Sequence, residues 1–165
     1  MNHLHSLVLA ITLLLVSVSV ATAQNFNKGL EAAQSGDYQT ALQEWRPLAA
    51  EQGDASAQFM IGGMYYGGEG VPQDYAEAVK WYRLAAEQGA ADAQHNLGVM
   101  YQFGDGVLQS NVMAHMWYNI ASANGHPKLG ERRDGIAGQM TSAEISKAQE
   151  MARECMSSNY QNCGW

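Results

Sequence analysis

The sequence predicts an all-α protein in which antiparallel helix pairs stack into a solenoid. Two observations support this fold class. When the chain is compared with itself at a shift of 36 residues, positions 53–88 and 89–124 are identical at 15 of 36 sites without a gap, and periods of this length are typical of helix-pair repeats. Within each copy, apolar residues recur at helical spacing on both sides of a glycine-rich turn.

Each 36-residue unit is expected to hold two helices. In the first unit, the glycine-rich residues 67–72 should separate them, because glycine adopts turn conformations freely. Asp74 is the expected N-cap of the second helix, and Gly89 is the glycine expected to follow its end. The apolar stripe of the first helix consists of Ala57, Met60, Ile61, Met64 and Tyr65.

Trp45, Trp81 and Trp117 recur at 36-residue steps. A row of tryptophans could form a ligand-binding box. We interpret these three as one repeated core position, because a solenoid fills the same core site in every unit.

The sequence on either side of the two units resembles incomplete copies. Residues 36–42 resemble residues 73–79 at a shift of 37, so one extra residue near Pro47 should kink or locally loosen that helix, and residues 26–35 would form its partner. Downstream, a helix is expected from Pro127 to about Gln139, and a capping-box signature from Thr141 to Glu144 should open a last helix. The predicted organisation is a signal peptide (1–23), an N-terminal partial repeat (24–54), two full repeats (55–90 and 91–126), and capping helices with a cysteine-containing tail (127–165).

The N-terminus predicts export. The run from Leu7 to Val20 is apolar but short for a membrane-spanning helix, and Ala21-Thr22-Ala23 has the small-x-small pattern of a signal-peptidase site. Cleavage after Ala23 would leave a periplasmic or secreted protein without stable membrane insertion. The alternative is a short membrane anchor that stays attached.

The two cysteines, Cys155 and Cys163, are expected to form a disulfide, because exported proteins enter an oxidising compartment. Closing a loop of nine residues would stabilise the fold by about 2.6 kcal/mol in the chain-entropy estimate. A pair of free thiols and a redox couple are the alternatives, although a Cys-x-x-Cys motif is absent.

Composition and motifs argue against several functions. The net charge of −7 disfavours nucleic-acid partners and favours cationic ones. The sequence contains no Ser-x-x-Lys, Gly-x-Ser-x-Gly or His-Glu-x-x-His motif. No two of His95, His115 and His126 stand at helical spacing from each other, and the only carboxylate at such a spacing is Asp92, three residues before His95. We therefore predict that the protein has no catalytic residues and binds no metal or cofactor. We also predict that it is a monomer.

The repeated residues resemble a known family. The pattern Ala-x-x-x-(Leu/Ile)-Gly-x-x-Tyr-x-x-Gly-x-Gly-Val, followed by Asp-x-x-x-Ala-x-x-Trp-Tyr-x-x-Ala-Ala-x-x-Gly, is complete in residues 57–89 and nearly complete in 93–125, where Ser110 and Ser122 depart from it. It is similar to the Sel1-like repeat (SLR), a relative of the tetratricopeptide repeat. The resemblance implies a right-handed α-solenoid of about eight helices.

The resemblance also implies a function. It predicts a scaffold or adaptor of the bacterial envelope or secreted space that binds a protein or peptide in the concave groove of the solenoid. A cysteine-rich branch of the family is associated with penicillin binding and β-lactamase activity, so the alternative is an enzyme that acts on the cell wall or on β-lactams. That branch has cysteine pairs within its repeats, which this chain lacks. A third possibility is a small stabilising subunit that docks through its convex face or caps.

Candidate binding residues come from the positions where the two units differ. On the first helices, 59, 60, 63, 66 and 67 differ from 95, 96, 99, 102 and 103, and the resemblance implies that first helices line the concave face. Ordinary surface variation is the alternative explanation. The groove-binding candidates are Phe59, Tyr66, His95, Asn96 and Gln102.

Overall fold

The computed structural model describes residues 22–125 and 129–164, and all regular secondary structure within these ranges is helical. Residues 1–21 of the predicted leader, His126 and Pro127 lie outside the described residues. The first helix of the described chain covers residues 22–34. It is followed by α2 (Tyr38–Ala50), α3 (Ala55–Gly67), α4 (Tyr75–Ala86), α5 (Ala91–Phe103), α6 (Asn111–Ala123), α7 (Leu129–Ala137) and α8 (Ser142–Ser157).

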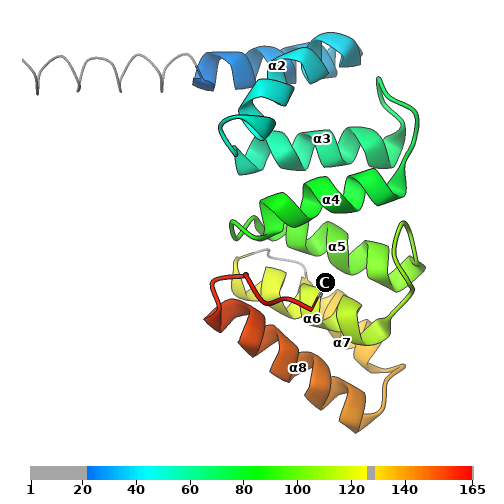
Figure 1. The fold of residues 1–165 in the computed structure, drawn as a ribbon. Coiled ribbons are helices and arrows are strands. Elements are labelled where there is room, and N and C mark those ends of the chain that lie inside the picture. The colour runs from blue at the N-terminus through cyan, green and yellow to red at the C-terminus, as the bar shows by residue number, and fades with distance from the viewer. Residues whose placement is uncertain (1–21, 126–128, 165) are drawn as a thin grey trace, which may run out of the picture.

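The helices stack in chain order from one end of the molecule to the other (Figure 1). Each helix from α2 to α6 packs against the next one along the chain, so the two predicted units are the pairs α3–α4 and α5–α6. We call the helices 22–34, α3 and α5 the first helices, and α2, α4 and α6 the second helices. This arrangement confirms the predicted all-α solenoid.

Within each central pair, a glycine of the first helix receives an aromatic ring of the second helix. A Cβ atom added to Gly62 would lie 2.7 Å from the ring of Tyr82, and one added to Gly98 would lie 2.6 Å from the ring of Tyr118. Both tyrosines are buried, and burial raises the pKa of Tyr82 to about 12. The repeated glycines are therefore the places where rings fill the space between paired helices.

The N-terminal pair, formed by the helix 22–34 and α2, has the same ring-to-glycine contact. Its ring comes from Trp45, which the 36-residue shift aligns with the wrong residue. A Cβ atom on Gly29 would collide with the ring of Trp45, so Trp45 is the counterpart of Tyr82 and Tyr118. The prediction that Trp45 shares the position of Trp81 and Trp117 is wrong, because the extra residue in this unit moves the second helix by one position. Trp45 is buried, as a core residue should be.

The first pair also differs from the others in its connections. Gly29 and Trp45 are 16 residues apart, whereas Gly62 and Tyr82 are 20 apart, since the first pair lacks the Gly-x-Gly-Val loop. Pro47 does not end α2, which continues to Ala50. The extra residue instead widens the closing turn, where the Asp54 N–H donates to the Leu48 carbonyl across six residues.

Buried amides join each pair to the next. Gln58 on α3 donates from Nε2 to the Ala49 carbonyl on α2 over 3.1 Å, and Gln94 on α5 donates to the Ala86 carbonyl on α4 over 3.1 Å. The side-chain oxygens of these two glutamines accept from Gln88 and Asn124, respectively, over 2.8 Å. Because Gln58 and Gln94 are nearly inaccessible to water, their hydrogen bonds fix the spacing between neighbouring pairs.

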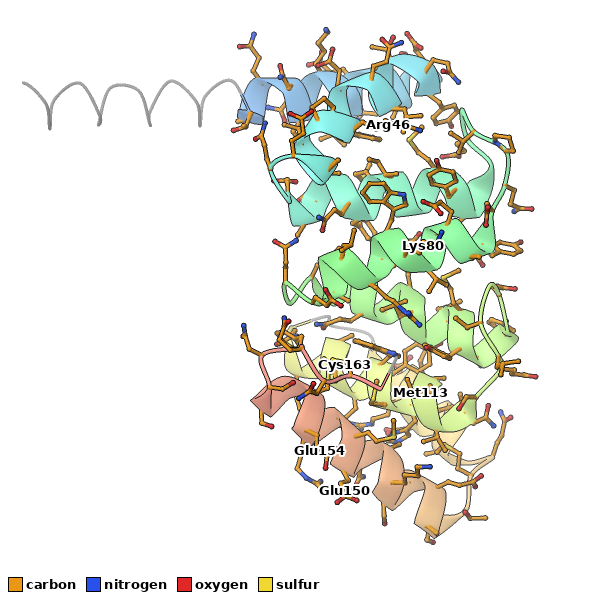
Figure 2. All side chains as sticks on the ribbon, in the orientation of Figure 1. Arg46, Lys80, Met113, Glu150, Glu154 and Cys163 are labelled. Carbon is orange, nitrogen blue, oxygen red and sulfur yellow. A yellow bond between two sulfur atoms is a disulfide. The ribbon has the colours of Figure 1, made fainter. Side chains whose placement is uncertain are left out.

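The C-terminal end is built differently. Both α7 and α8 pack against α6. Thr141 and Glu144 form the predicted capping box at the start of α8, and Cys155 and Cys163 form a disulfide with Cα atoms 4.5 Å apart. The tail after α8 turns back across α6 (Figure 1), and Figure 2 shows Cys163 there on the same side of the molecule as Met113.

A tyrosine of this tail contacts the repeats. Tyr160 donates a hydrogen bond to the Asn124 side chain over 3.0 Å, and its ring lies 3.4 Å from the position of a Cβ on Gly89. Asn124 in turn contacts Gln94. The disulfide therefore holds a segment that bonds the end of α6 and touches the turn between α4 and α5.

Candidate functional site

Two cavities lie between successive first helices. The N-terminal cavity opens to the surface and is bounded by the helix 22–34, α2, α3 and the loop after α3. Its volume is about 230 Å³, and it is lined by Ala33, Tyr38, Trp45, Phe59, Met60, Gly63, Met64 and Glu69. The central cavity, between α3, α4 and α5, has a volume of about 90 Å³ and is lined by Tyr66, Tyr82, Asn96 and Val99. Three of the five candidate residues, Phe59, Tyr66 and Asn96, line these cavities.

The central cavity brings Tyr66 and Asn96 together, as two of the five candidates. The ring of Tyr66 packs against that of Tyr75, with centroids 5.2 Å apart and an angle of 51° between the rings, and its hydroxyl donates to Asp105 over 3.4 Å. The side chain of Asn96 hydrogen-bonds Tyr82. This cavity therefore combines a fixed aromatic ring with an amide at its wall.

Phe59 and His95 occupy equivalent places. The Phe59 ring lies 5.8 Å from the ring of Tyr82, and the His95 ring lies 5.6 Å from that of Tyr118. Phe26 stands in the same relation to Trp45, at 6.1 Å. Each of these rings covers the aromatic residue that fills its pair, so substitution at Phe59 or His95 would affect packing as well as any surface function.

Gln102 also serves the fold. Its side-chain oxygen accepts a hydrogen bond from the Tyr118 hydroxyl over 2.7 Å, and its backbone carbonyl accepts one from Gln109 over 2.8 Å. Burial raises the pKa of Tyr118. The structure places Gln102 and His95 on the same buried ring and outside both cavities.

Sequence reasoning missed most of the N-terminal cavity. Of its lining residues, only Phe59 was selected, although positions 60 and 63 were among those that differ between the units. Tyr38 and Glu69 carry its polar edge, where the Tyr38 hydroxyl donates to Glu69 over 3.2 Å, and the carboxylate of Glu69 raises the pKa of Tyr38. The Gly63/Val99 difference was the available signal, because a missing side chain opens space.

The described residues contain neither a cluster of metal ligands nor a helix suited to a membrane. Within residues 22–125 and 129–164, no group of three or more His, Cys, Asp or Glu side chains is placed to hold a metal ion. In the same ranges, none of the helices has both the length and the apolar character needed to span a bilayer. His115 is buried on α6, and burial lowers its pKa.

Residues 55–89 and 91–126, the two central helix pairs, match the Sel1 repeat. A Sel1 repeat protein from Oxalobacter formigenes is 32% identical, with a TM-score of 0.59 over 63% of this chain and 82% of that chain. The chain belongs to the Sel1 repeat family.

A second solved structure extends this likeness along the chain. It is a protective antigen present in uropathogenic Escherichia coli strains that displays an SLR fold, and it matches 84% of this chain at 28% identity with a TM-score of 0.77. The chain spans only 31% of that protein's length. None of the curated proteins matches the chain. The Sel1 repeat fold indicates a protein-interaction scaffold.

Proposed function

We propose that this Sel1 repeat protein is a binding scaffold that takes a segment of a partner protein along the face of its first helices. The observation that carries the proposal is the position of the two cavities, which follow one another along this face between successive first helices. Solenoids typically bind along such extended surfaces. The residues that line the cavities differ between units, whereas the rings and glycines beneath them recur.

Charge supports a partner with basic or hydrogen-bond-donating groups. The chain carries 16 acidic and 9 basic residues, and carboxylates stand at comparable places beside both cavities, Glu69 at the first and Asp105 at the second. Complementary charge steers association and disfavours anionic partners. The alternative of docking through the second helices predicts contact on the opposite side of each pair.

Site-specific photo-crosslinking distinguishes the two faces. A photoreactive phenylalanine analogue replaces either Met60 or Asn96 on the first helices, and as matched controls either Arg46 or Lys80, which are exposed on α2 and α4 (Figure 2). Covalent adducts formed in the native host are identified by mass spectrometry. We expect one partner to be captured at Met60 and Asn96 but not at Arg46 or Lys80.

Binding measurements then test the captured partner. The double variant Met60→Ala/Asn96→Ala should raise the dissociation constant of the complex with this partner by roughly tenfold or more, because a few central residues dominate most interfaces. Phe59 and His95 are avoided because they pack on core rings. Capture from Arg46 and Lys80 alone would overturn the proposal and favour docking through the second helices.

We also propose that the protein is exported, with the periplasm or the secreted space as its site of action. The apolar run Leu7–Val20 and the small residues Ala21 and Ala23 support this proposal. Intact mass of protein from the host envelope or medium should correspond to a chain that begins at Gln24. A chain that keeps residues 1–23 would contradict cleavage and favour an attached anchor.

A further inference from the structure

The two cavities occupy equivalent positions in successive helix pairs, and they differ in the size of the side chains at two of these positions. Ala33 follows Gly29 by four residues, as Tyr66 follows Gly62, so Ala33 and Tyr66 hold the same position in successive first helices. Gly63 and Val99 are likewise equivalent. At both positions the N-terminal cavity has the smaller residue, which accounts for its larger volume, about 230 Å³ against about 90 Å³.

The N-terminal cavity lacks the ring of Tyr66 but has equivalents of the residues that contact this ring in the central cavity. In the central cavity, the Tyr66 ring packs against that of Tyr75 at an inclination of 51°, and its hydroxyl donates to the Asp105 carboxylate. In the N-terminal cavity, the equivalents of these two partners are Tyr38 and Glu69, and both line the space. The N-terminal cavity therefore has an aromatic ring and a carboxylate at the positions that contact a tyrosine side chain in the central cavity.

We propose that the N-terminal cavity is an anchor site for a tyrosine side chain of the partner protein, a proposal that rests on the proposed function. The incoming ring occupies the place equivalent to that of Tyr66 in the central cavity and packs against the ring of Tyr38. Its hydroxyl donates to the carboxylate of Glu69.

The chemistry of the lining supports tyrosine over other residues. Trp45, Phe59, Met60 and Met64 form apolar and aromatic walls, which suit a ring and make favourable sulfur–aromatic contacts. Glu69 is exposed at the edge of the cavity, and a hydroxyl-to-carboxylate hydrogen bond is stronger than one between neutral groups. Glu69 already accepts from the Tyr38 hydroxyl, and a carboxylate can accept further hydrogen bonds. A phenylalanine would fill the space but could not add a second donor to this carboxylate.

The amide of N-acetyl-tyrosine is the probe, with the amide of N-acetyl-phenylalanine as its control. Binding is followed by NMR through the methyl groups of Met60 and Met64 in the full-length exported protein. We expect a dissociation constant of roughly 1 mM for the tyrosine amide, typical of a ligand of this size. The phenylalanine amide should bind about tenfold more weakly, because it cannot reach Glu69.

Three variants locate the site. Ala33→Tyr supplies the missing ring from the chain itself and should abolish the methyl shifts. Glu69→Ala should reduce the preference for tyrosine to about twofold or less. Tyr66→Ala opens the central cavity and should create a second site for the tyrosine amide, detected as shifts of the Val99 methyl signals. If this third variant does not fold, Ala33→Tyr and Glu69→Ala are sufficient to test the anchor site.

Several outcomes would overturn the anchor. The anchor site is wrong if the Ala33→Tyr variant binds the tyrosine amide as well as the wild type does, or if the wild type binds the two amides equally. It is also wrong if the Met60 and Met64 methyl signals do not shift up to the solubility limit of the tyrosine amide. Self-association of the wild type that Ala33→Tyr removes would identify a second copy as the occupant and also overturn it. The photo-crosslinking experiment is independent, so capture at Met60 and Asn96 without probe binding would reject the anchor alone.

Discussion

The central helix pairs and the C-terminal end are stabilised by different means. In α3–α4 and α5–α6, a ring from the second helix enters the space beside a glycine of the first. At the C-terminal end, Asp134 stands 36 residues after Gly98, so the glycine is not repeated. There the fold relies on a capping box, a disulfide and a tail that reaches back to α6.

The difference lies in how each region is packed. Each central unit contacts a helix pair on both sides, whereas among the described residues α7 and α8 pack mainly on α6. Ile136 keeps the buried position of Met64 and Met100, each 36 residues earlier, so the register of the first helices continues into α7. The close contact between helices is replaced by local crosslinks, which do not require a further unit.

The largest expected effect is the loss of a ring in a central pair. Tyr118→Ala should lower the free energy of unfolding by about 3–5 kcal/mol, since a fully buried aromatic side chain is removed and a cavity remains. Urea denaturation followed by circular dichroism measures this change. Leu108→Ala, at a side chain 91% exposed, is the control and should change stability by less than about 0.5 kcal/mol. Equal effects of the two variants would show that ring-to-glycine packing does not stabilise the centre.

The disulfide should have the next largest effect, and it should be local to the C-terminal end. Cys155→Ala/Cys163→Ala is expected to cost about 2.6 kcal/mol through the greater entropy of the unfolded chain. Hydrogen exchange should increase in α8 and the tail while α3 and α4 keep their protection. The intact mass of native protein should be two hydrogens lower than after reduction, and free thiols in exported protein would contradict the pairing.

The buried amides test whether the tail is coupled to the repeats. Gln94→Ala should cost about 1–3 kcal/mol, because it leaves buried groups of Ala86 and Asn124 without their partner. Gln58→Ala should cost less, since its partner Gln88 also donates to the Gly53 and Leu84 carbonyls. Only Gln94→Ala should speed hydrogen exchange in the tail, through the Asn124–Tyr160 contact. An equal effect of both variants on the tail would show that this coupling is absent.

The repeated sequence made the centre of the fold predictable. Gly62 and Gly98 recur at the 36-residue shift, and the structure shows which rings approach them. The identity of Gln58 and Gln94 was visible in the same comparison, but a polar repeat does not reveal its partner. Trp45 was misplaced because a fixed 36-residue shift cannot follow an added residue.

The ends and the candidate site were less predictable for a physical reason. The contact between Tyr160 and Asn124 joins a tail to a repeat and has no periodic counterpart that could be recognised. The volume of the N-terminal cavity depends on Ala33, which lies in a first helix without a close match to the other units. Conversely, His95 and Gln102 vary between units although both contact the buried Tyr118, so variation alone does not identify a binding surface.

The smallest expected effect concerns a difference between the two central units themselves. α3 begins after Asp54, whose carboxylate accepts from the Ala57 N–H over 2.7 Å, whereas α5 begins after Ala90 without a side-chain cap. The two residues have nearly the same backbone angles, φ −63° and ψ 116° for Asp54 and φ −64° and ψ 105° for Ala90. Ala90→Asp should therefore add a cap and raise the free energy of unfolding by about 0.5–1 kcal/mol, with Asp92 in the first turn reducing the gain through like charge. Thermal and urea denaturation measure the gain, and Ala90→Asn, a cap without charge, is the matched control. A loss of stability in both variants would mean that the half-buried Ala90 methyl contributes more through packing than a cap restores, and the two central units would then differ in packing as well as in sequence.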